Sequence, residues 1–189
     1  MKDIFTGTLV RLSAVDPDEF SKAFSLWGRD SEFNRLLQTN AAGLQSSNTI
    51  KRWMEKDMED SATGFYVFSI RTLADDKLVG GTDLEVVTWN GRDAFVGIFI
   101  GARENWGKGY GTDAMNILLR YAFTELNLWR VSLGVFEYNP RAIRSYEKAG
   151  FQHEGRTRQQ LQHEGKRWDI FFMGTLREEW LKQNKVSLS

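Results

Sequence analysis

The stretch ENWGKGYGTDA, residues 104–114, holds three glycines at every second position, Gly107, Gly109 and Gly111. Apolar residues then recur at helical spacing up to about residue 127, which predicts an amphipathic helix. Glycine destabilises a helix by roughly 0.5–1 kcal/mol relative to alanine, so three glycines at a helix start need a reason. A helix start offers free backbone N–H groups and the positive end of the helix dipole, and glycines let that backbone close around an anion. The stretch therefore predicts an anion-binding loop, with a tight strand-to-helix turn as the alternative.

Two common nucleotide-binding motifs do not match this stretch. A Walker A loop needs four residues between its glycines and then Lys-Ser or Lys-Thr, but five residues separate Gly101 from Gly107, and glycine follows Lys108. A Rossmann loop needs Gly-x-Gly-x-x-Gly, whereas the spacing here is Gly-x-Gly-x-Gly. Both motifs are therefore excluded.

Composition narrows the class of protein. The chain has 189 residues, which predicts one domain over 1–189, and its 25 Lys and Arg balance its 25 Asp and Glu. This balance gives no reason to expect a nucleic-acid or membrane partner. There is no cysteine, so disulfides, thiolate zinc sites and cysteine-bound intermediates are excluded. The N-terminus lacks a signal-peptide hydrophobic region and no apolar run nears the roughly 20 residues of a spanning helix, so we expect a cytoplasmic protein.

The tetrapeptide Gln-His-Glu-Gly occurs twice, at 152–155 and 162–165. We interpret the repeat as two similar turns or bulges around one hairpin. Metal binding by His153 and His163 is the alternative, but no other ligands cluster with them in the sequence. We expect no metal cofactor.

The hydrophobic pattern predicts alternating strands and helices. Strands are expected at 8–12, 65–70, 78–87, 94–100, 130–136, 151–160 and 166–175, and helices at 17–27, 49–60, 112–127, 139–149 and 176–183. Asn-Gly within Trp89–Arg92 predicts a tight hairpin turn. Hairpins mixed with crossovers indicate an α+β fold with a mixed sheet. The crossover helix 112–127 predicts that strands 94–100 and 130–136 lie in parallel.

Two stretches resemble the GNAT superfamily of N-acetyltransferases. WGKGYG, residues 106–111, resembles the pyrophosphate loop [QR]-x-x-G-x-[GA] of that superfamily, with Trp106 at the position of Gln or Arg. NPRAIRSYEKAGF, residues 139–151, resembles its segment N-x-x-[AS]-x-x-x-Y-[EQ]-K-x-G-F. Tryptophan at position 106 and the tail Lys166–Trp180 are similar to the RimJ/RimL-like branch. The resemblance implies a mixed, mostly antiparallel central sheet flanked by helices, with parallel splayed strands at the acyl-CoA site.

The resemblance also implies acetyl-CoA as co-substrate and a set of residues that hold it. Backbone N–H groups of the loop would bind the pyrophosphate, the amides near Phe99–Ile100 would hold the thioester carbonyl, and Asn139 would fix the pantetheine arm or a water. The implied cofactor-binding residues are Phe99, Ile100, Trp106, Gly107, Lys108, Gly109, Tyr110, Gly111, Thr112, Asn139, Arg141, Arg144 and Tyr146, with Lys148 as a further candidate for the phosphates. For the three cations a solvated helix face is the alternative. For Asn139 the alternative, compatible with the first role, is an N-cap with Pro140 at the first helical position.

The reaction that the resemblance implies needs an acid and a base. Tyr146 would protonate the departing sulfur, since a phenol is protonated at neutral pH; a half-buried aromatic is the alternative for this residue. Several RimJ/RimL-like enzymes carry a glutamate in the strand before the loop, where this chain has Phe95. Asp83 and Glu85, on the preceding strand and facing the same side, are the nearest acidic substitutes. Solvent-facing carboxylates are the alternative for both.

Three functional hypotheses follow. The first is an acetyl-CoA-dependent N-acetyltransferase for a primary amine such as a protein N-terminus, a polyamine, an aminoglycoside or an amino sugar. The second is a non-catalytic acyl-CoA-binding module, which Phe95 favours, and the third is a nucleotide-binding or structural domain. The segments 29–49 and 153–166 are expected to form the acceptor pocket. A homodimer through a sheet edge or through the splayed strands is left open.

Overall fold

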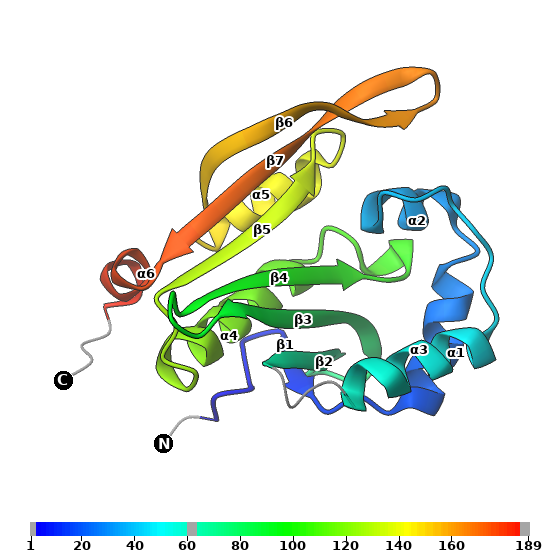
Figure 1. Cartoon of the computed structure of the whole chain (residues 1–189). Coiled ribbons are helices and arrows are strands. Elements are labelled where there is room, and N and C mark those ends of the chain that lie inside the picture. The colour runs from blue at the N-terminus through cyan, green and yellow to red at the C-terminus, as the bar shows by residue number, and fades with distance from the viewer. Residues whose placement is uncertain (1–2, 60–63, 186–189) are drawn as a thin grey trace.

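The computed structural model describes residues 3–59 and 64–185, and seven strands formed by these residues make one sheet (Figure 1). Its spatial order is β1-β2-β3-β4-β5-β7-β6. Every neighbouring pair is antiparallel except β4 and β5, which are parallel. The strands are β1 (Val10–Ser13), β2 (Phe65–Thr72), β3 (Leu78–Thr88), β4 (Asp93–Ile100), β5 (Arg130–Phe136), β6 (Gln152–His163) and β7 (Lys166–Leu176). The predicted α+β fold, with its mixed and mostly antiparallel sheet, is confirmed.

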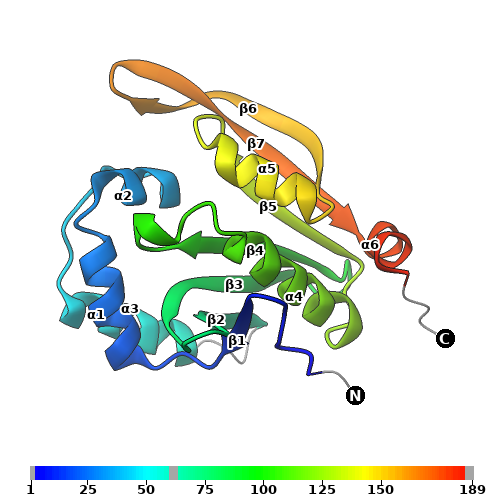
Figure 2. The same cartoon turned by 180° about the vertical axis from the view of Figure 1, so that it is seen from behind.

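Helices cover the two faces of the sheet unequally. They are α1 (Pro17–Trp27), α2 (Ser31–Leu37), α3 (Ser47–Glu59), α4 (Tyr110–Thr124), α5 (Pro140–Lys148) and α6 (Arg177–Asn184), with a short 3₁₀ helix, η2 (Arg103–Asn105). Figure 2 shows α4 and α5 against one face of the sheet. It also shows α1, α2 and α3 grouped at the end of the molecule opposite α6. Phe20 of α1 packs over Gly81 of β3, whereas Leu84 of the same strand faces the core beneath α4. Since residues an odd number apart on a strand point to opposite faces, α1 and α4 lie on opposite sides of the sheet.

Local sequence explains where the helices begin. Asp16 caps α1 and Asn139 caps α5, and a proline follows each cap at the first helical position. In contrast, α4 begins after Gly109, whose φ of 87° lies in the left-handed region and which supplies no side-chain cap. The start of α4 is therefore left open for another partner.

Two expectations about local structure are corrected. Helix α2 was not predicted, although Asp30 caps it and Phe33, Leu36 and Leu37 recur at helical spacing. Its seven residues are too short for periodicity to stand out. The turn between β3 and β4 has the expected place but not the expected type, because the positive φ falls on Arg92 (51°) instead of on the Asn-Gly pair.

The repeated tetrapeptide forms one bulge and one turn at the two ends of β6. The pairing of β6 with β7 shifts register between His153 and Gly155, and Glu164 and Gly165 form the hairpin turn with positive φ. This agrees with the interpretation as turns and bulges. Within residues 3–59 and 64–185, no three His, Asp or Glu side chains are grouped so as to hold a metal ion. No helix in those same residues is long and apolar enough to cross a bilayer.

The N-terminal segment is tied to the start of α4 by one carboxylate. Asp113 accepts hydrogen bonds from the backbone N–H groups of Thr8 (2.9 Å), Leu9 (2.8 Å) and Val10 (3.0 Å), and from the hydroxyl of Thr8 (3.0 Å). A Cβ atom at Gly7 would collide with this carboxylate, so glycine is needed there. The contact fixes β1 and the first turn of α4 relative to each other.

We expect Asp113→Ala to lower the free energy of unfolding by about 2–3 kcal/mol, because it strands several donors that now bind a charged acceptor. Thermal denaturation should show a midpoint lowered by roughly 5–10 °C. Asn116→Ala, on the exposed side of the same helix, is the matched control and should change stability by less than about 0.5 kcal/mol. Equal shifts in the two variants would contradict the role given to Asp113.

Candidate active site

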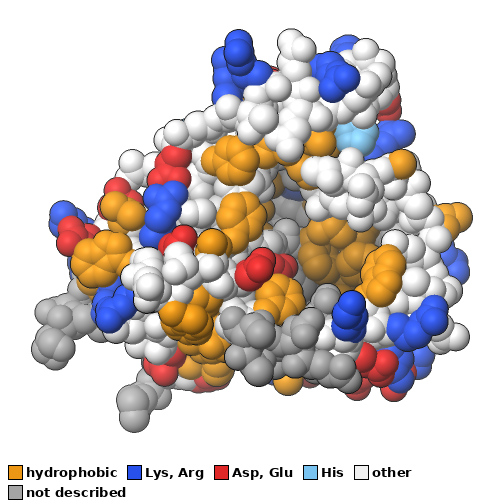
Figure 3. All heavy atoms as spheres, viewed as in Figure 1, with side chains coloured by type: hydrophobic (Ala, Val, Ile, Leu, Met, Phe, Trp, Pro, Cys, Tyr) orange, Lys and Arg blue, Asp and Glu red, His pale blue; other side chains and the backbone are white. Residues whose placement is uncertain are grey.

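The parallel strands β4 and β5 separate soon after they meet. They pair only at Asp93–Arg130, Ala94–Val131 and Phe95–Ser132, and then diverge. The predicted splayed strands are therefore confirmed. A cavity of about 550 Å³ occupies the split, and five consecutive residues, 96–100, line it. Because alternate residues of a strand face opposite sides, the cavity spans both faces of the sheet. Figure 3 shows the hollow on the side away from α4 and α5, with hydrophobic side chains around it.

The glycine loop, residues 107–112, forms one wall of this cavity. Gly107 and Gly109 have φ values of 75° and 87°, a left-handed conformation that favours glycine. Gly111 and Thr112 line the cavity beside them, whereas Lys108 and Tyr110 lie outside its lining. The first N–H groups of α4 have no partner within the helix, so they are free to bind an anion. The hydroxyls of Thr112 and Ser145 are 2.7 Å apart and join the start of α4 to the second half of α5.

Trp106 connects the loop to the end of β4. Its indole N–H donates to the carbonyl oxygens of Ile100 (2.8 Å) and Gly101 (3.1 Å). The guanidinium of Arg141 lies 4.0 Å from the centre of its ring and that of Arg103 lies 5.4 Å away. Trp106 therefore positions both the backbone of the loop and a cation at the cavity.

Backbone geometry decides which amides of β4 face the split. The carbonyl of Gly97 accepts from Thr82 and the N–H of Gly101 donates to Val79, so odd-numbered residues direct their backbone groups toward β3. Alternation along the strand then directs the N–H of Ile100 toward β5 and that of Phe99 toward β3. Of the two amides expected to hold a carbonyl oxygen, strand geometry favours Ile100, although the side chain of Phe99 lines the cavity.

Three cations of α5 approach the same cavity. Arg141, Arg144 and Lys148 all contribute to its lining, together with the α5 residues Ala142 and Ser145. Arg141 is partly buried, and this burial lowers the pKa of its guanidinium. The helix face that they share is therefore turned toward the cavity as well as toward solvent.

Tyr146 and Asn139 also reach the cavity from α5. Tyr146 is buried, with 8% of its surface exposed, and burial together with the carboxylate of Asp83 raises the pKa of its phenol to about 12. It is therefore protonated at neutral pH and able to donate. Asn139 caps α5 by accepting from the N–H of Ala142 (3.2 Å) and lines the cavity as well, so its two expected roles are compatible.

The acidic candidates are separated by the structure. Asp83 lines the cavity and lies above Gly97, where a Cβ atom would come 2.6 Å from its carboxylate oxygen. Glu85 is exposed and is paired in register with Phe95. Neither of these two residues belongs to the cavity lining. Asp83 is thus the acidic candidate that shares a cavity with Tyr146.

Several lining residues were missed by sequence reasoning. Phe33, Leu36 and Leu37 of α2 face the cavity, as do Phe136 of β5 and the buried Asn105 of η2. The segment 29–49 therefore contributes as expected, through an unexpected helix. No residue of 153–166 is in the lining; that hairpin instead contacts α2, where Glu164 pairs with Arg35 at 2.7 Å. The only signal for α2 was the helical spacing of three apolar residues after Asp30.

Comparisons with known proteins place these features in a family. A family model described as an acetyltransferase (GNAT) domain matches residues 9–152. The probable N-acetyltransferase YjcK of Bacillus subtilis is 38% identical over 113 residues, so the alignment spans 59% of either chain. The spermidine N(1)-acetyltransferase of Vibrio cholerae is 30% identical over 141 residues, which cover 75% of this chain and 79% of that one.

A solved structure agrees in architecture. The crystal structure of spermidine N-acetyltransferase from Vibrio cholerae in complex with CoA and spermine superposes with a TM-score of 0.79 at 25% identity. The superposition covers 91% of this chain and 98% of that one. With the family model matching most of its length, this chain belongs to the GNAT family of N-acetyltransferases.

Proposed function

We propose that this protein transfers the acetyl group of acetyl-CoA directly to a primary amine in a ternary complex. The observation that carries the proposal is a single cavity, open to both faces of the sheet, which holds a glycine loop, a protonated phenol and a carboxylate. The relatives that act on spermidine and the putative ribosomal N-acetyltransferase YdaF of Bacillus subtilis support an amine acceptor. We also propose that the chain belongs to the RimJ/RimL-like branch, because Trp106 at the start of the loop is similar to that branch.

The chain's own groups fit the diphosphate of acetyl-CoA. The loop 107–112 presents backbone N–H groups and the positive end of α4, and glycines keep side chains out of the space in front of them. Arg141, Arg144 and Lys148 add positive charge on the adjacent helix. The N–H of Ile100 would hold the thioester carbonyl oxygen as it gains negative charge.

The amine must lose a proton before it can attack. An alkyl amine with a pKa near 10.4 is neutral in only about one molecule in a thousand at pH 7, which costs roughly 4–5 kcal/mol. That first proton leaves to solvent by way of Asp83. Asp83 then accepts a second proton, directly or through a water, as the neutral nitrogen bonds to the acetyl carbon. Tyr146 donates its proton to the sulfur as the carbon–sulfur bond breaks. The products are an amide and a free thiol. Of the two protons that the ammonium loses, one replaces the proton that Tyr146 gives to the sulfur, and the other is released to solvent.

A non-catalytic acyl-CoA-binding module is the second candidate, favoured by Phe95 at the usual acidic position. Isothermal titration with acetyl-CoA, combined with a thiol-release assay over an amine panel, separates the two. Binding followed by thiol release with at least one amine supports the enzyme. Binding without release on any amine supports the module, and absence of binding contradicts both.

We expect Gly111→Val to weaken acetyl-CoA binding by about tenfold. Gly111→Ala, at a position where the motif accepts alanine, should bind acetyl-CoA as wild type does, with the fold kept or slightly stabilised. The added methyl would meet only ordinary contacts, 3.8 Å from Ile100 and 3.9 Å from Ser145, and alanine favours a helix by about 0.5–1 kcal/mol. The two further methyls of valine would, in contrast, stand in front of the loop amides. Titration calorimetry and thermal denaturation measure the two effects. Gly111→Ala and Asn116→Ala are the controls, and an unchanged dissociation constant for Gly111→Val would favour the simple turn.

We expect Tyr146→Phe to lower kcat by about 10²-fold and to change the dissociation constant of acetyl-CoA less than threefold, since only the proton donor is lost. Because the phenol pKa is about 12, wild-type kcat should show no loss from phenol ionisation up to pH 10. Tyr121→Phe, remote from the cavity in a cluster with Phe5 and Phe68, should match wild type. Full turnover by Tyr146→Phe would remove this residue from the mechanism.

The two acidic candidates are compared through Asp83→Asn and Glu85→Gln. We expect Asp83→Asn to lower kcat at pH 7 by about 10²-fold, and the deficit to shrink toward pH 9 as more of the amine is already neutral. The phenol pKa of Tyr146 should also fall in Asp83→Asn, since this carboxylate helps to raise it. Steady-state kinetics and a tyrosine NMR titration give both readouts. A larger loss of kcat in Glu85→Gln would transfer the base role to Glu85.

A further inference from the structure

We infer that the preferred acceptor carries its reactive amine on an apolar arm with no second positive charge, unlike the polyamine named for the Vibrio cholerae relatives. The inference rests on the proposed function. It concerns the acceptor half of the same cavity, which is the part lined by α2, Phe99 and Phe136. It follows from the apolar wall and from the placement of carboxylates around it.

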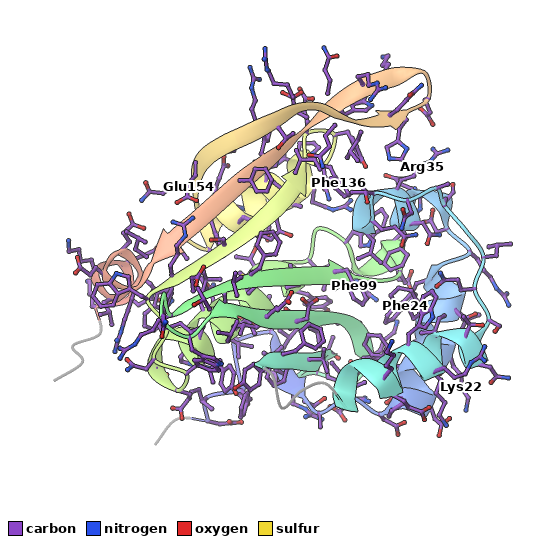
Figure 4. The ribbon with its side chains drawn as sticks, viewed as in Figure 1. Lys22, Phe24, Arg35, Phe99, Phe136 and Glu154 are labelled. Atoms are coloured by element: carbon purple, nitrogen blue, oxygen red, sulfur yellow. The ribbon has the colours of Figure 1, made fainter. Side chains whose placement is uncertain are left out.

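The wall of the acceptor half is apolar. Phe33, Leu36 and Leu37 lie on one side of α2 and line the cavity together with Phe99 and Phe136. The rings of Phe33 and Phe99 are 5.8 Å apart and nearly perpendicular, in an edge-to-face arrangement. Figure 4 shows Phe99 at the end of β4 near α2, and Phe136 at the open end of β5. A hydrocarbon or aromatic arm that enters beside α2 therefore meets hydrophobic side chains.

Carboxylates are scarce in the same place. Among the described residues that line the cavity, Asp83 is the one acid, against the three cations Arg141, Arg144 and Lys148. Asp83 serves the reactive amine in the proposed mechanism. A polyamine places a second ammonium a short alkyl chain away, where it would meet the wall of Leu36, Leu37 and Phe136. Burial of a charge against apolar groups without a partner is unfavourable.

The acids at the edges of α2 are already engaged by arginines. Arg103 forms ion pairs with Asp30 and Glu32, and Arg35 pairs with Glu164 at 2.7 Å. Such exposed ion pairs are individually weak. Each guanidinium nevertheless offsets the charge of its carboxylate, so the carboxylate attracts an approaching ammonium less.

The same contacts hold the wall in place. Arg103 joins the start of α2 to Trp106 beside the glycine loop, and Arg35 joins the last turn of α2 to the β6–β7 turn. The hydroxyl of Tyr138 also donates to the carbonyl oxygen of Arg35 at 2.7 Å. With both sides of α2 anchored, the apolar wall is a preformed surface for the acceptor arm.

The first experiment compares acceptors with the wild-type protein. Thiol release from acetyl-CoA is measured with 2-phenylethylamine and hexylamine, each with one amine, and with putrescine and spermidine. We expect kcat/KM for 2-phenylethylamine to exceed that for spermidine by at least about tenfold. Equal or better use of spermidine would overturn this inference and leave the proposed function standing. No turnover of any amine would overturn both.

The second experiment adds a carboxylate to the wall. Leu37→Glu should raise kcat/KM for spermidine and lower it for 2-phenylethylamine, each by about tenfold, so that the preference moves toward the polyamine. Thr39→Glu adds the same charge at an exposed neighbouring position outside the lining and should leave the preference unchanged. Equal effects of the two variants would contradict a role for the wall. If Leu37→Glu does not fold, the wild-type comparison still decides the inference.

Discussion

The structure depends on one interruption of backbone pairing, where β4 and β5 stop hydrogen bonding after three residue pairs. Unpaired backbone groups in a sheet interior are costly, so the split requires other partners for them. The protein satisfies one such group internally, because the indole of Trp106 donates to the carbonyl oxygen of Ile100. The N–H of Ile100, turned to the same side, stays directed at the cavity. The interruption therefore creates a binding site with oriented donors that an unbroken sheet would not have.

Charge is divided along the cavity in a way that suits a transfer between unlike partners. The start of α4 and three cations of α5 make one end favourable for phosphates, while Asp83 makes the opposite face of the sheet favourable for an ammonium. Tyr146 reaches into the same split from α5, and burial together with that carboxylate keeps its phenol protonated. A protonated donor thus stands in the same split as a carboxylate.

Sequence reasoning succeeded where the function of a residue depends on its neighbours along the chain. The glycines at 107 and 109 form a loop before α4 and have positive φ, Asn139 caps its helix before Pro140, and the crossover helix sets β4 and β5 in parallel. The acceptor wall could not be predicted in the same way, because α2 is short and faces residues far away in sequence. The choice between Asp83 and Glu85 was also open, since both point to one face and only the position of the split separates them.

The register of β3 against β4 explains how an acid can serve the site although Phe95 stands at the expected position. Asp83 pairs with Gly97, and Glu85 pairs with Phe95 one step farther from the split. Any side chain at position 97 would place its Cβ 2.6 Å from the carboxylate of Asp83, so the glycine is what admits that carboxylate to the cavity. The ring of Phe95 lies nearer the paired ends of the strands. Its Cζ atom is 3.6 Å from the position that a Cβ atom at Gly134 would take. In the proposed mechanism the acidic residue therefore lies on β3 instead of on its neighbour β4, and this placement needs both Asp83 and Gly97.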